Sequence, residues 1–277
     1  MIELNQIYFT YGRKPLFNNL DLTIPSGSIY GLLGMNGAGK TTLLKLLSGQ
    51  LFCKGGEAEV LGCDPKKRSP LMLADIFYLP EEFYLPNMPI ATYVKLNIPF
   101  YPKFDEQEFL HFLETFRLDT NQRISDYSFG QKKKFLLAFG LASHTALVIL
   151  DEPTNGLDIP SKSQFRRTVA STFTEERTFI ISTHQVRDME NLIDPIIILH
   201  NGNIIFNESI EEVSKMITMK LETEEAFGPD VIYNEPVPGG YSVVRKRTEG
   251  QEETMINLET LFNAVIASPD AFKGARG

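Results

Sequence analysis

The 277-residue sequence contains no tryptophan, has only two cysteines, and lacks an excess of basic side chains. Cys53 and Cys63 have no neighbouring histidine or further cysteine to complete a four-ligand metal site, so we expect reduced thiols. The 35 acidic side chains outnumber the 27 basic ones, which gives a formal charge of -8. This balance argues against a nucleic-acid-binding protein, which needs a broad basic surface to neutralise phosphates.

Long apolar segments are also missing. No hydrophobic run approaches the roughly 18 residues of a membrane-spanning helix, and the first residues lack the basic and then apolar pattern of a secretory signal. With 43% hydrophobic and 22% charged residues, the composition is typical of a soluble globular protein. We therefore expect a cytoplasmic chain that forms one large domain, or a main domain with an appendage.

The acidic excess is concentrated towards the C-terminus. Residues 1–207 carry 20 basic and 22 acidic side chains, a balance of -2, whereas residues 208–277 carry 7 and 13, a balance of -6. We interpret residues 1–207 as the main domain and 208–277 as a packed accessory extension; the alternative is a regulatory or dimer-stabilising element. The extension is expected to contain an acidic amphipathic helix over 208–225, a hairpin over 230–247 and a final helix over 256–267.

Short apolar segments that alternate with helical patterns predict an α/β fold. Continuous apolar runs are typical of parallel strands that helices cover on both faces. Between about residues 88 and 143, apolar positions recur at helical spacing, as at Phe109, Phe112 and Phe116, which indicates a helical insert. Strands are expected at residues 2–4, 7–9, 21–24, 28–33, 58–61, 76–79, 146–150, 178–182, 195–199 and 204–206.

The strongest motif lies between residues 34 and 41. Gly34-Met-Asn-Gly-Ala-Gly39-Lys40-Thr41 fits the pattern G-x-x-x-x-G-K-[ST], and it follows a predicted strand and opens a predicted helix over 41–48. The N–H groups of such a P-loop and the helix dipole cradle a polyphosphate, with the lysine on the β and γ phosphates and the threonine hydroxyl on Mg²⁺. The expected ligand contacts are Asn36, Gly37, Ala38, Gly39, Lys40, Thr41 and Thr42.

Two carboxylates follow the predicted strand over 146–150. Asp151 and Glu152 would lie at the edge where open parallel sheets bind their ligands. Asp151 is suited to bind Mg²⁺, and Glu152 to orient a water molecule for attack on a γ phosphate. A strand that runs into an acidic turn would show the same residues, but the P-loop upstream favours the catalytic interpretation.

A capping box precedes the helix that is expected after residue 128. Ser128 and Gln131 have the spacing that satisfies the first N–H groups of a helix. An exposed helix start of this kind can also bind an anion, and the local pattern does not separate the two roles. We interpret the run Lys132–Lys134 as a solvated helix face; the alternative is that it helps to attract nucleotide. Three further histidines are interpreted as structural or surface residues: His111, His144 and His200.

The order of the motifs along residues 1–207 is itself informative. The motifs are Tyr11, the P-loop, Tyr78-Leu-Pro-Glu81, Tyr127-Ser-Phe-Gly-Gln131, Leu150-Asp-Glu-Pro-Thr-Asn-Gly-Leu-Asp158 and Ser182-Thr-His184. This order resembles that of the nucleotide-binding subunits of ABC transporters. The resemblance implies a P-loop NTPase fold of the ABC type: a mostly parallel sheet, an N-terminal antiparallel β subdomain and a helical insert, followed here by a small α+β extension.

The resemblance also assigns roles to residues whose local pattern carries little information. It implies that Tyr11 stacks on adenine and that Asp158 communicates across a dimer. Ser128, Gly130 and Gln131 would form the signature motif that reaches the γ phosphate of ATP bound by the opposite subunit. The expected catalytic residues are Lys40, Glu152 and His184, where His184 contacts the γ phosphate, and the expected Mg²⁺ ligands are Thr41, Glu81 and Asp151.

Two positions depart from the family pattern. In the family, the position of Glu81 is usually a glutamine, which helps to arrange Mg²⁺ and water and relays the nucleotide state to the membrane partner. The Glu81 carboxylate can ligate a cation but adds a negative charge. Phe129 replaces the first of two glycines in the signature, so the anion-binding residues persist while a bulky ring alters the fit across the dimer.

The function implied by the resemblance is an ATP-hydrolysing motor subunit that dimerises head to tail. It would use ATP and Mg²⁺ and drive separate transmembrane permease subunits from the cytoplasmic face of the cell membrane. The Tyr-Leu-Pro-Glu motif, the stretch from Phe100 to Asp105 and the extension look most similar to ABC-2 type exporters. The alternatives are an ATP-gated soluble scaffold or non-transport ABC ATPase with slow turnover, and a heterodimer in which this chain supplies one weakened site.

Overall fold

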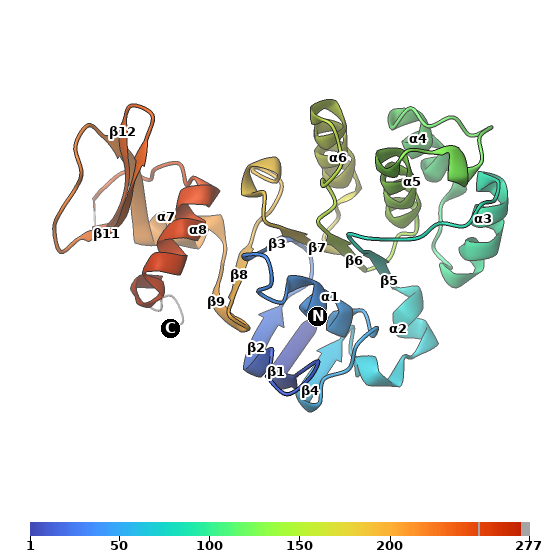
Figure 1. Cartoon of the computed structure of the whole chain (residues 1–277), viewed down its shortest axis with the longest axis horizontal. Helices are drawn as coiled ribbons and strands as arrows, with labels where there is room; N and C mark the ends of the chain where they lie inside the picture. The colour runs from blue at the N-terminus through green and yellow to red at the C-terminus, as the bar shows by residue number, and fades with distance from the viewer. Residues whose placement is uncertain (249, 273–277) are drawn as a thin grey trace.

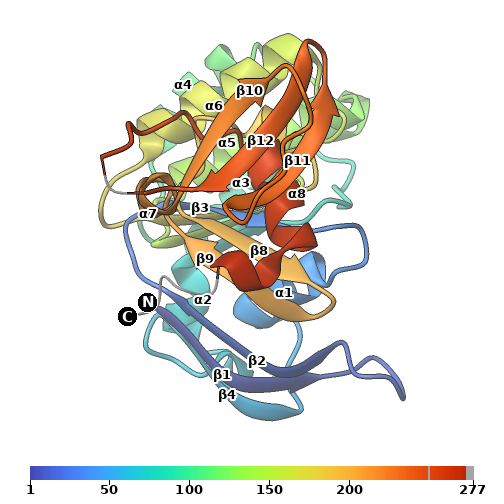
Figure 2. The same ribbon diagram turned by 90° about the vertical axis from the view of Figure 1, so that its left-hand side faces the viewer.

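The computed structural model describes residues 1–248 and 250–272. Its strands form three sheets, which the helices cover in the arrangement shown in Figure 1. The N-terminal sheet lies at the bottom of this view, the helices of the insert at the upper right and the C-terminal elements at the left, with the largest sheet between them. Figure 2 shows the N-terminal sheet again at one end of the molecule, below the central sheet.

The six-stranded central sheet has the order β5-β6-β7-β3-β8-β9. Its strands are β3 (Ile29–Leu33), β5 (Ile76–Leu79), β6 (Leu147–Asp151), β7 (Thr178–Thr183), β8 (Ile196–His200) and β9 (Asn203–Glu208). All pairings are parallel except that of β8 with β9. β3, β6 and β7 are buried along their whole length, which explains their continuous apolar runs. Because these three strands are neighbours, the segments that follow them meet at one edge of the sheet.

The N-terminal sheet contains β1 (Ile2–Phe9), β2 (Phe17–Ile24) and β4 (Gly55–Val60), paired antiparallel in the order β2-β1-β4. The prediction of separate strands at 2–4 and 7–9 is wrong, because these residues belong to one strand. The register of β1 shifts between Leu4 and Ile7, where Gln6 has a φ of 51°. This bulge moves the alternation by one residue and so returns Ile7 to the buried face.

Helices cover both faces of the central sheet. The helix α1 (Lys40–Leu47) follows the loop after β3, α2 (Pro70–Ala74) precedes β5, and α6 (Ile159–Thr172) lies between β6 and β7. The predicted helical region contains α3 (Ile90–Asn97), α4 (Glu106–Thr115) and α5 (Phe129–Ala142). The ring of Phe139 holds these helices together: its centroid lies 4.8 to 6.1 Å from the rings of Tyr93, Tyr101, Phe104 and Phe109.

The C-terminal elements differ in one respect from the sequence prediction. They are α7 (Ile210–Met216), β10 (Ile217–Glu222), β11 (Val231–Val237), β12 (Gly240–Lys246) and α8 (Leu258–Ala267). The predicted hairpin and final helix are confirmed. The helix expected over 208–225 is wrong beyond Met216, since β10 pairs antiparallel with β12. Ile217 and Met219 are buried in the core, and Thr218 between them is buried as well.

The apolar core has two parts. One joins the N-terminal sheet, α1 and one face of the central sheet. The other joins the helical insert, the opposite face of the central sheet and the C-terminal elements without a break. Phe206 of β9 contacts Phe272 with ring centroids 6.0 Å apart. The hydrophobic core therefore continues across residue 207, the boundary that the sequence predicts.

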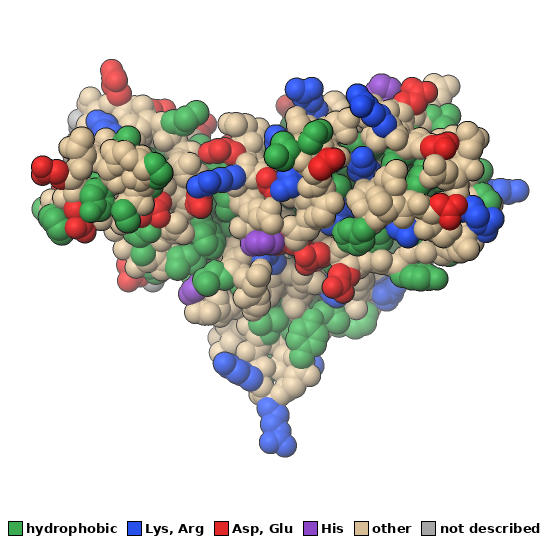
Figure 3. Space-filling view, turned by 45° about the horizontal axis from the view of Figure 1, so that its top comes forward, with side chains coloured by type: hydrophobic (Ala, Val, Ile, Leu, Met, Phe, Trp, Pro, Cys, Tyr) green, Lys and Arg blue, Asp and Glu red, His purple; other side chains and the backbone are tan. Residues whose placement is uncertain are grey.

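The surface carries mixed charge. Figure 3 shows two broad lobes above a narrower lower end, with acidic and basic side chains interspersed. Within residues 1–248 and 250–272, no helix is both long enough and apolar enough to cross a membrane. Cys53 is buried, Cys63 is partly buried, and both are free thiols.

Candidate functional site

The predicted P-loop connects β3 to α1. Gly39, at the start of α1, has a φ of 111°, and a Cβ there would lie 2.9 Å from the ring of Phe17. A Cβ on Gly34 would lie 2.5 Å from the carbonyl oxygen of Leu199. Glycine is therefore required at both positions, by backbone conformation at the first and by close packing at both. The N–H groups at the start of α1 remain available to an anion, since no side chain caps this helix.

The P-loop lines one side of a cavity of about 460 Å³. Its wall contains Tyr11, Leu16, Asn36, Gly37, Gly39, Lys40, Thr41, Thr42, Glu81 and Glu152. The structure thus brings residues that are as far as 141 positions apart in the sequence (152 minus 11) to one place. Of the ligand contacts predicted between Asn36 and Thr42, only Ala38 does not line this wall, and it is buried.

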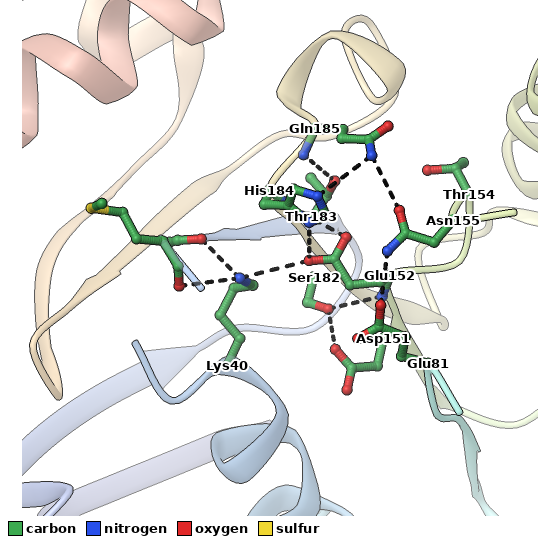
Figure 4. Close-up of polar contacts among 12 residues, drawn as sticks. Lys40, Glu81, Asp151, Glu152, Thr154, Asn155, Ser182, Thr183, His184 and Gln185 are labelled. Carbon is green, nitrogen blue, oxygen red and sulfur yellow. Dashed lines mark hydrogen bonds and ion pairs between the residues drawn. The ribbon is translucent and has the colours of Figure 1, made fainter. Parts of the chain in front are cut away.

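Lys40 lies between the P-loop and the catalytic candidates. Its ammonium group donates to the carbonyl oxygen of Gly34 at 2.8 Å and lies 3.6 Å from a carboxylate oxygen of Glu152. Figure 4 shows both contacts. Both side chains are almost fully buried, with exposed fractions of 8% and 5%. A buried cation and carboxylate at this distance attract each other, and Lys40 places a positive charge at the cavity wall.

Glu152 and His184 form the closest pair of titratable groups in the site. The Nδ1 atom of His184 lies 2.8 Å from Oε1 of Glu152, and the backbone N–H of His184 donates to Oε2 at 3.4 Å. Glu152 itself has a φ of 47°, an uncommon conformation for a residue with a side chain. Its N–H donates to the carbonyl and hydroxyl oxygens of Ser182. Strained conformations of this kind are typical of functional sites held by their surroundings.

Asp151 is fully buried at the end of β6. One carboxylate oxygen accepts a short hydrogen bond from the Ser182 hydroxyl, and the other accepts one from the Tyr78 hydroxyl at 3.5 Å. Burial and the nearby Asp151 carboxylate raise the pKa of Tyr78, so the phenol stays protonated and donates. These donors fix the orientation of Asp151 at the edge of the sheet.

A chain of polar side chains connects Glu81 to His184, as Figure 4 shows. The amide nitrogen of Asn155 donates to Glu81 at 2.9 Å, and its oxygen accepts from Gln185 at 3.4 Å. The Gln185 amide lies 3.4 Å from Nε2 of His184. Sequence reasoning missed Asn155, Gln185 and Ser182 as site residues. The available signal was their position: Asn155 and Ser182 lie within the motifs Leu150–Asp158 and Ser182–His184, and Gln185 directly follows the second.

Tyr11 stands at the rim of the cavity. Its side chain is 67% exposed, and its hydroxyl lies 3.1 Å from the hydroxyl of Thr42. Phe9 supports the ring edge-on, with centroids 4.9 Å apart. An exposed ring fixed in this way offers a face on which a base can stack.

The predicted signature residues lie outside the cavity. The capping box is confirmed: the Ser128 hydroxyl accepts from the Gln131 N–H at 3.3 Å, and the Gln131 side chain accepts from the Ser128 N–H at 2.9 Å. Gly130 follows in the first turn of α5, and Ser128 is exposed. Phe129, 49% exposed, stacks on Phe83 with centroids 5.2 Å apart and planes 13° apart. Phe129, which stands where the family pattern has glycine, thus connects the signature motif to the segment after Glu81.

The interpretation of Lys132–Lys134 as a solvated face is wrong for Lys133. This side chain is only 1% exposed, and its ammonium group donates to the carbonyl oxygens of Glu152 at 3.0 Å and Asn155 at 2.9 Å. Burial lowers the pKa of Lys133, while the nearby carboxylates of Glu81, Glu152 and Asp151 act in the opposite direction.

The other predicted polar residues have local roles. Asp158 caps α6 by accepting from the N–H of Ser161 at 2.8 Å. His144 pairs with Glu108 at 2.7 Å on the surface, His200 contacts Asn201 at 2.9 Å, and His111 is exposed. These three histidines lie away from the cavity wall.

Comparison with known proteins identifies the family. A sequence profile described as ABC transporter matches residues 17–155. The ABC transporter ATP-binding protein YtrB of Bacillus subtilis is 30% identical over 234 residues, covering 83% of this chain and 78% of YtrB. The lantibiotic transport ATP-binding protein SrtF of Streptococcus pyogenes is 28% identical over 239 residues, covering 84% and 98%. The bacitracin transport ATP-binding protein BcrA of Bacillus licheniformis is 30% identical over 227 residues, covering 80% and 74%.

Solved structures agree on the fold. A structure of an ATP-binding subunit of an ABC transporter superposes with a TM-score of 0.70 at 22% identity, covering 77% of this chain and 91% of that one. A nucleotide-free ATP-binding cassette from an ABC transporter gives a TM-score of 0.63 at 21% identity, covering 77% and 93%. The chain therefore belongs to the ABC transporter family and is one of its nucleotide-binding ATPase subunits.

Proposed function

We propose that this chain hydrolyses ATP as the motor subunit of an exporter whose membrane-spanning subunits are separate chains. The observation that carries the proposal is the convergence at one cavity of the P-loop, with Lys40, and of Glu152, whose carboxylate also pairs with His184. Phosphoryl transfer needs positioning and charge stabilisation more than covalent chemistry, and this wall supplies both.

Each side chain has a separate task in the proposed mechanism. The P-loop N–H groups bind the phosphates, and Lys40 exchanges its contact with the Gly34 carbonyl for the β and γ phosphate oxygens. Tyr11 stacks on the adenine. Glu152 orients the attacking water and accepts its proton at the carboxylate, while His184 holds Glu152 in place and donates towards the γ phosphate.

The residues around the cavity also fit a magnesium ion. Mg²⁺ prefers oxygen ligands and is usually bound by one or two carboxylates together with substrate phosphates. Thr41 and Glu81 line the cavity and supply a hydroxyl and a carboxylate of this type. Asp151, which is buried at the end of β6 and does not line the cavity, supplies a second carboxylate. When bound, the ion would neutralise charge on the phosphate oxygens.

Two substitutions test the site assignment in the purified full-length chain. Lys40→Ala removes the phosphate ligand and Glu152→Gln removes the proton acceptor, so we expect each to lower kcat for ATP about 100-fold or more. Lys45→Ala, on the same helix, and Glu82→Gln, beside Glu81, are the matched controls and should stay within about 2-fold of the wild type. If Lys40→Ala and Glu152→Gln both hydrolyse ATP at the wild-type rate, the proposed site is wrong.

The dimer and the division of the chain are further parts of the proposal. In a head-to-tail dimer, Ser128, Gly130 and Gln131 would face ATP bound by the opposite subunit, and Asp158 would lie at the contact. With ATP, Glu152→Gln should therefore elute as a dimer in size-exclusion chromatography. We propose residues 1–207 as the ATPase domain, with the helical insert at about 88–143, and residues 208–277 as an accessory extension.

The names of the relatives support an export role. SrtF and BcrA are named as lantibiotic and bacitracin transport ATP-binding proteins, and a further relative, of Rhizobium meliloti, as a Nod factor export ATP-binding protein. We infer that this chain belongs to the ABC-2 type exporter subgroup and works at the cytoplasmic face of the cell membrane, bound to its permease subunits.

A further inference from the structure

Lys133 is the most deeply buried cation near the site. At 1% exposure it is less accessible than Lys40, at 8%, although its neighbours in the sequence, Lys132 and Lys134, are only partly buried. Burying an ammonium group is unfavourable unless hydrogen bonds replace its water. Two carbonyl oxygens do so here, and the ring of Phe129 lies 5.3 Å from the ammonium group.

The two carbonyl groups belong to one turn. The N–H of Asn155 donates to the carbonyl of Glu152 at 3.2 Å, so the oxygens that Lys133 binds lie at the first and last residues of this turn. The first residue, Glu152, is in the left-handed conformation, and its N–H is held by Ser182 of β7. The turn is thus fixed from two sides, by β7 at its N–H and by α5 at its carbonyls.

We propose that Lys133 is a positioning residue for ATP hydrolysis, which holds the turn Glu152–Asn155 so that the Glu152 carboxylate faces the attacking water. Lys133 does not line the cavity itself and acts through Glu152, which does. The inference rests on the proposed function, because it assumes that Glu152 is the residue that activates water.

The hydrogen bonds of Lys133 to the turn Glu152–Asn155 also link the hydrolysis site to the signature motif at the start of α5. Lys133 lies one turn after Phe129 in α5, the helix whose first residues carry the signature motif. A shift of α5 on engagement of the signature would therefore move the two carbonyls that Lys133 binds, and with them the Glu152 side chain of the same chain. Lys133 accordingly ties the hydrolysis site of a subunit to the site that the subunit helps to complete in its partner.

Substitutions that separate hydrogen-bond donation from packing test the role of Lys133. Lys133→Met fills a similar volume without a donor, whereas Lys133→Gln donates from a shorter side chain. In the full-length chain we expect kcat to fall about 30-fold for Lys133→Met and about 5-fold for Lys133→Gln, the range expected for a lost buried hydrogen bond. KM for ATP should stay within about 2-fold, because Lys133 does not touch the nucleotide site.

The controls make each outcome decisive. Lys132→Met, the adjacent position, should keep kcat, and retained ATP binding shows that a variant is folded. The proposal is overturned if Lys133→Met keeps more than half of kcat, if Lys133→Gln falls as far as Lys133→Met, or if KM rises while kcat is unchanged. If Lys133→Met does not fold, a wild-type kcat for Lys133→Gln is enough to overturn the proposal. Absence of ATPase activity in the wild-type chain would instead overturn the proposed function, and the role of Lys133 with it.

Discussion

At the scale of single residues, the site depends on contacts between side chains that are far apart in the sequence. Glu152 is held by Ser182 of β7, by His184, which directly follows β7, and by Lys40 of α1. Asn155 extends this arrangement to Glu81 through an amide whose nitrogen donates to the carboxylate and whose oxygen accepts from Gln185. The amide therefore suits this position, because one end must donate and the other must accept.

Replacing Asn155 with Asp keeps the oxygen that accepts from Gln185 but places a second carboxylate against Glu81. We expect Asn155→Asp to lower the free energy of unfolding by roughly 1 kcal/mol at pH 8, a modest value because Glu81 is exposed. Two adjacent carboxylates repel each other only when both are ionised. The loss of unfolding free energy is therefore expected at pH 8, where both carry a charge, and should fade near pH 4, where one of them takes up a proton.

Urea unfolding at both pH values measures this effect. Asn155→Ala is the control, because it removes both hydrogen bonds without adding a charge, and its effect should not change between the two pH values. High salt should reduce the difference between the variants at pH 8. A deficit of Asn155→Asp that is the same at pH 4 and pH 8 would contradict the electrostatic explanation.

At the scale of helices and strands, local chemistry and long-range packing decide different things. The P-loop was predictable because its function depends on backbone groups in one continuous segment, between β3 and α1. The capping box at Ser128 was predictable for the same reason. The burial of Lys133 was not, because it depends on which side of α5 faces the turn after β6, and three consecutive lysines fit a solvated face equally well.

β10 illustrates a second limit of the sequence. The acidic residues from Glu208 onward fit an amphipathic helix, but the strand begins at Ile217, where α7 ends and pairing with β12 takes over. Strand pairing depends on partner residues that lie 19 to 29 positions further along the chain (241 minus 222 and 246 minus 217), which a local pattern does not identify. The resemblance to a known family supplied His184 and Tyr11, whose neighbouring residues carry little signal of their own.

α8 provides an element-scale prediction about stability. Leu261 is 1% exposed and belongs to the hydrophobic cluster that continues into the central sheet. We expect Leu261→Ala to lower the free energy of unfolding by about 2 to 5 kcal/mol, as for other buried leucines. Leu221→Ala, at a side chain that is 63% exposed, is the control and should change it by less than about 0.5 kcal/mol.

Chemical unfolding followed by circular dichroism measures both variants. Because the core runs without a break from the insert to α8, the destabilised variant should still unfold in one transition. Two separate transitions, of which only one responds to Leu261→Ala, would show that the C-terminal elements unfold on their own.

At the scale of the whole molecule, the candidate nucleotide cavity and the C-terminal elements pack in different parts of the core, since α1 belongs to one cluster and α7, β10, β12 and α8 belong to the other. Among the residues that the structure describes, none beyond Glu152 lines the cavity wall. The nearest connection is η4 (Val186–Asp188), the turn that follows His184: Arg187 forms an ion pair with Glu259 of α8 at 2.5 Å, and Val186 is buried in the common cluster. The ion pair is exposed and contributes little to stability, so apolar packing carries the contact between α8 and the segment after His184.

Truncation after Glu208, which keeps β9 whole, separates binding from hydrolysis. We expect the truncated chain to bind ATP with a Kd within about 3-fold of the full chain, because the cavity wall is retained. Its unfolding temperature should fall by several degrees, since Phe206 and Val186 lose their apolar cover. We also expect kcat to fall more than ATP affinity, because the segment that positions His184 loses the helix packed against it. Loss of ATP binding in a truncated chain that circular dichroism still shows to be folded would contradict this division between the cavity, which binds the nucleotide, and the C-terminal elements, which steady the residues that hydrolyse it.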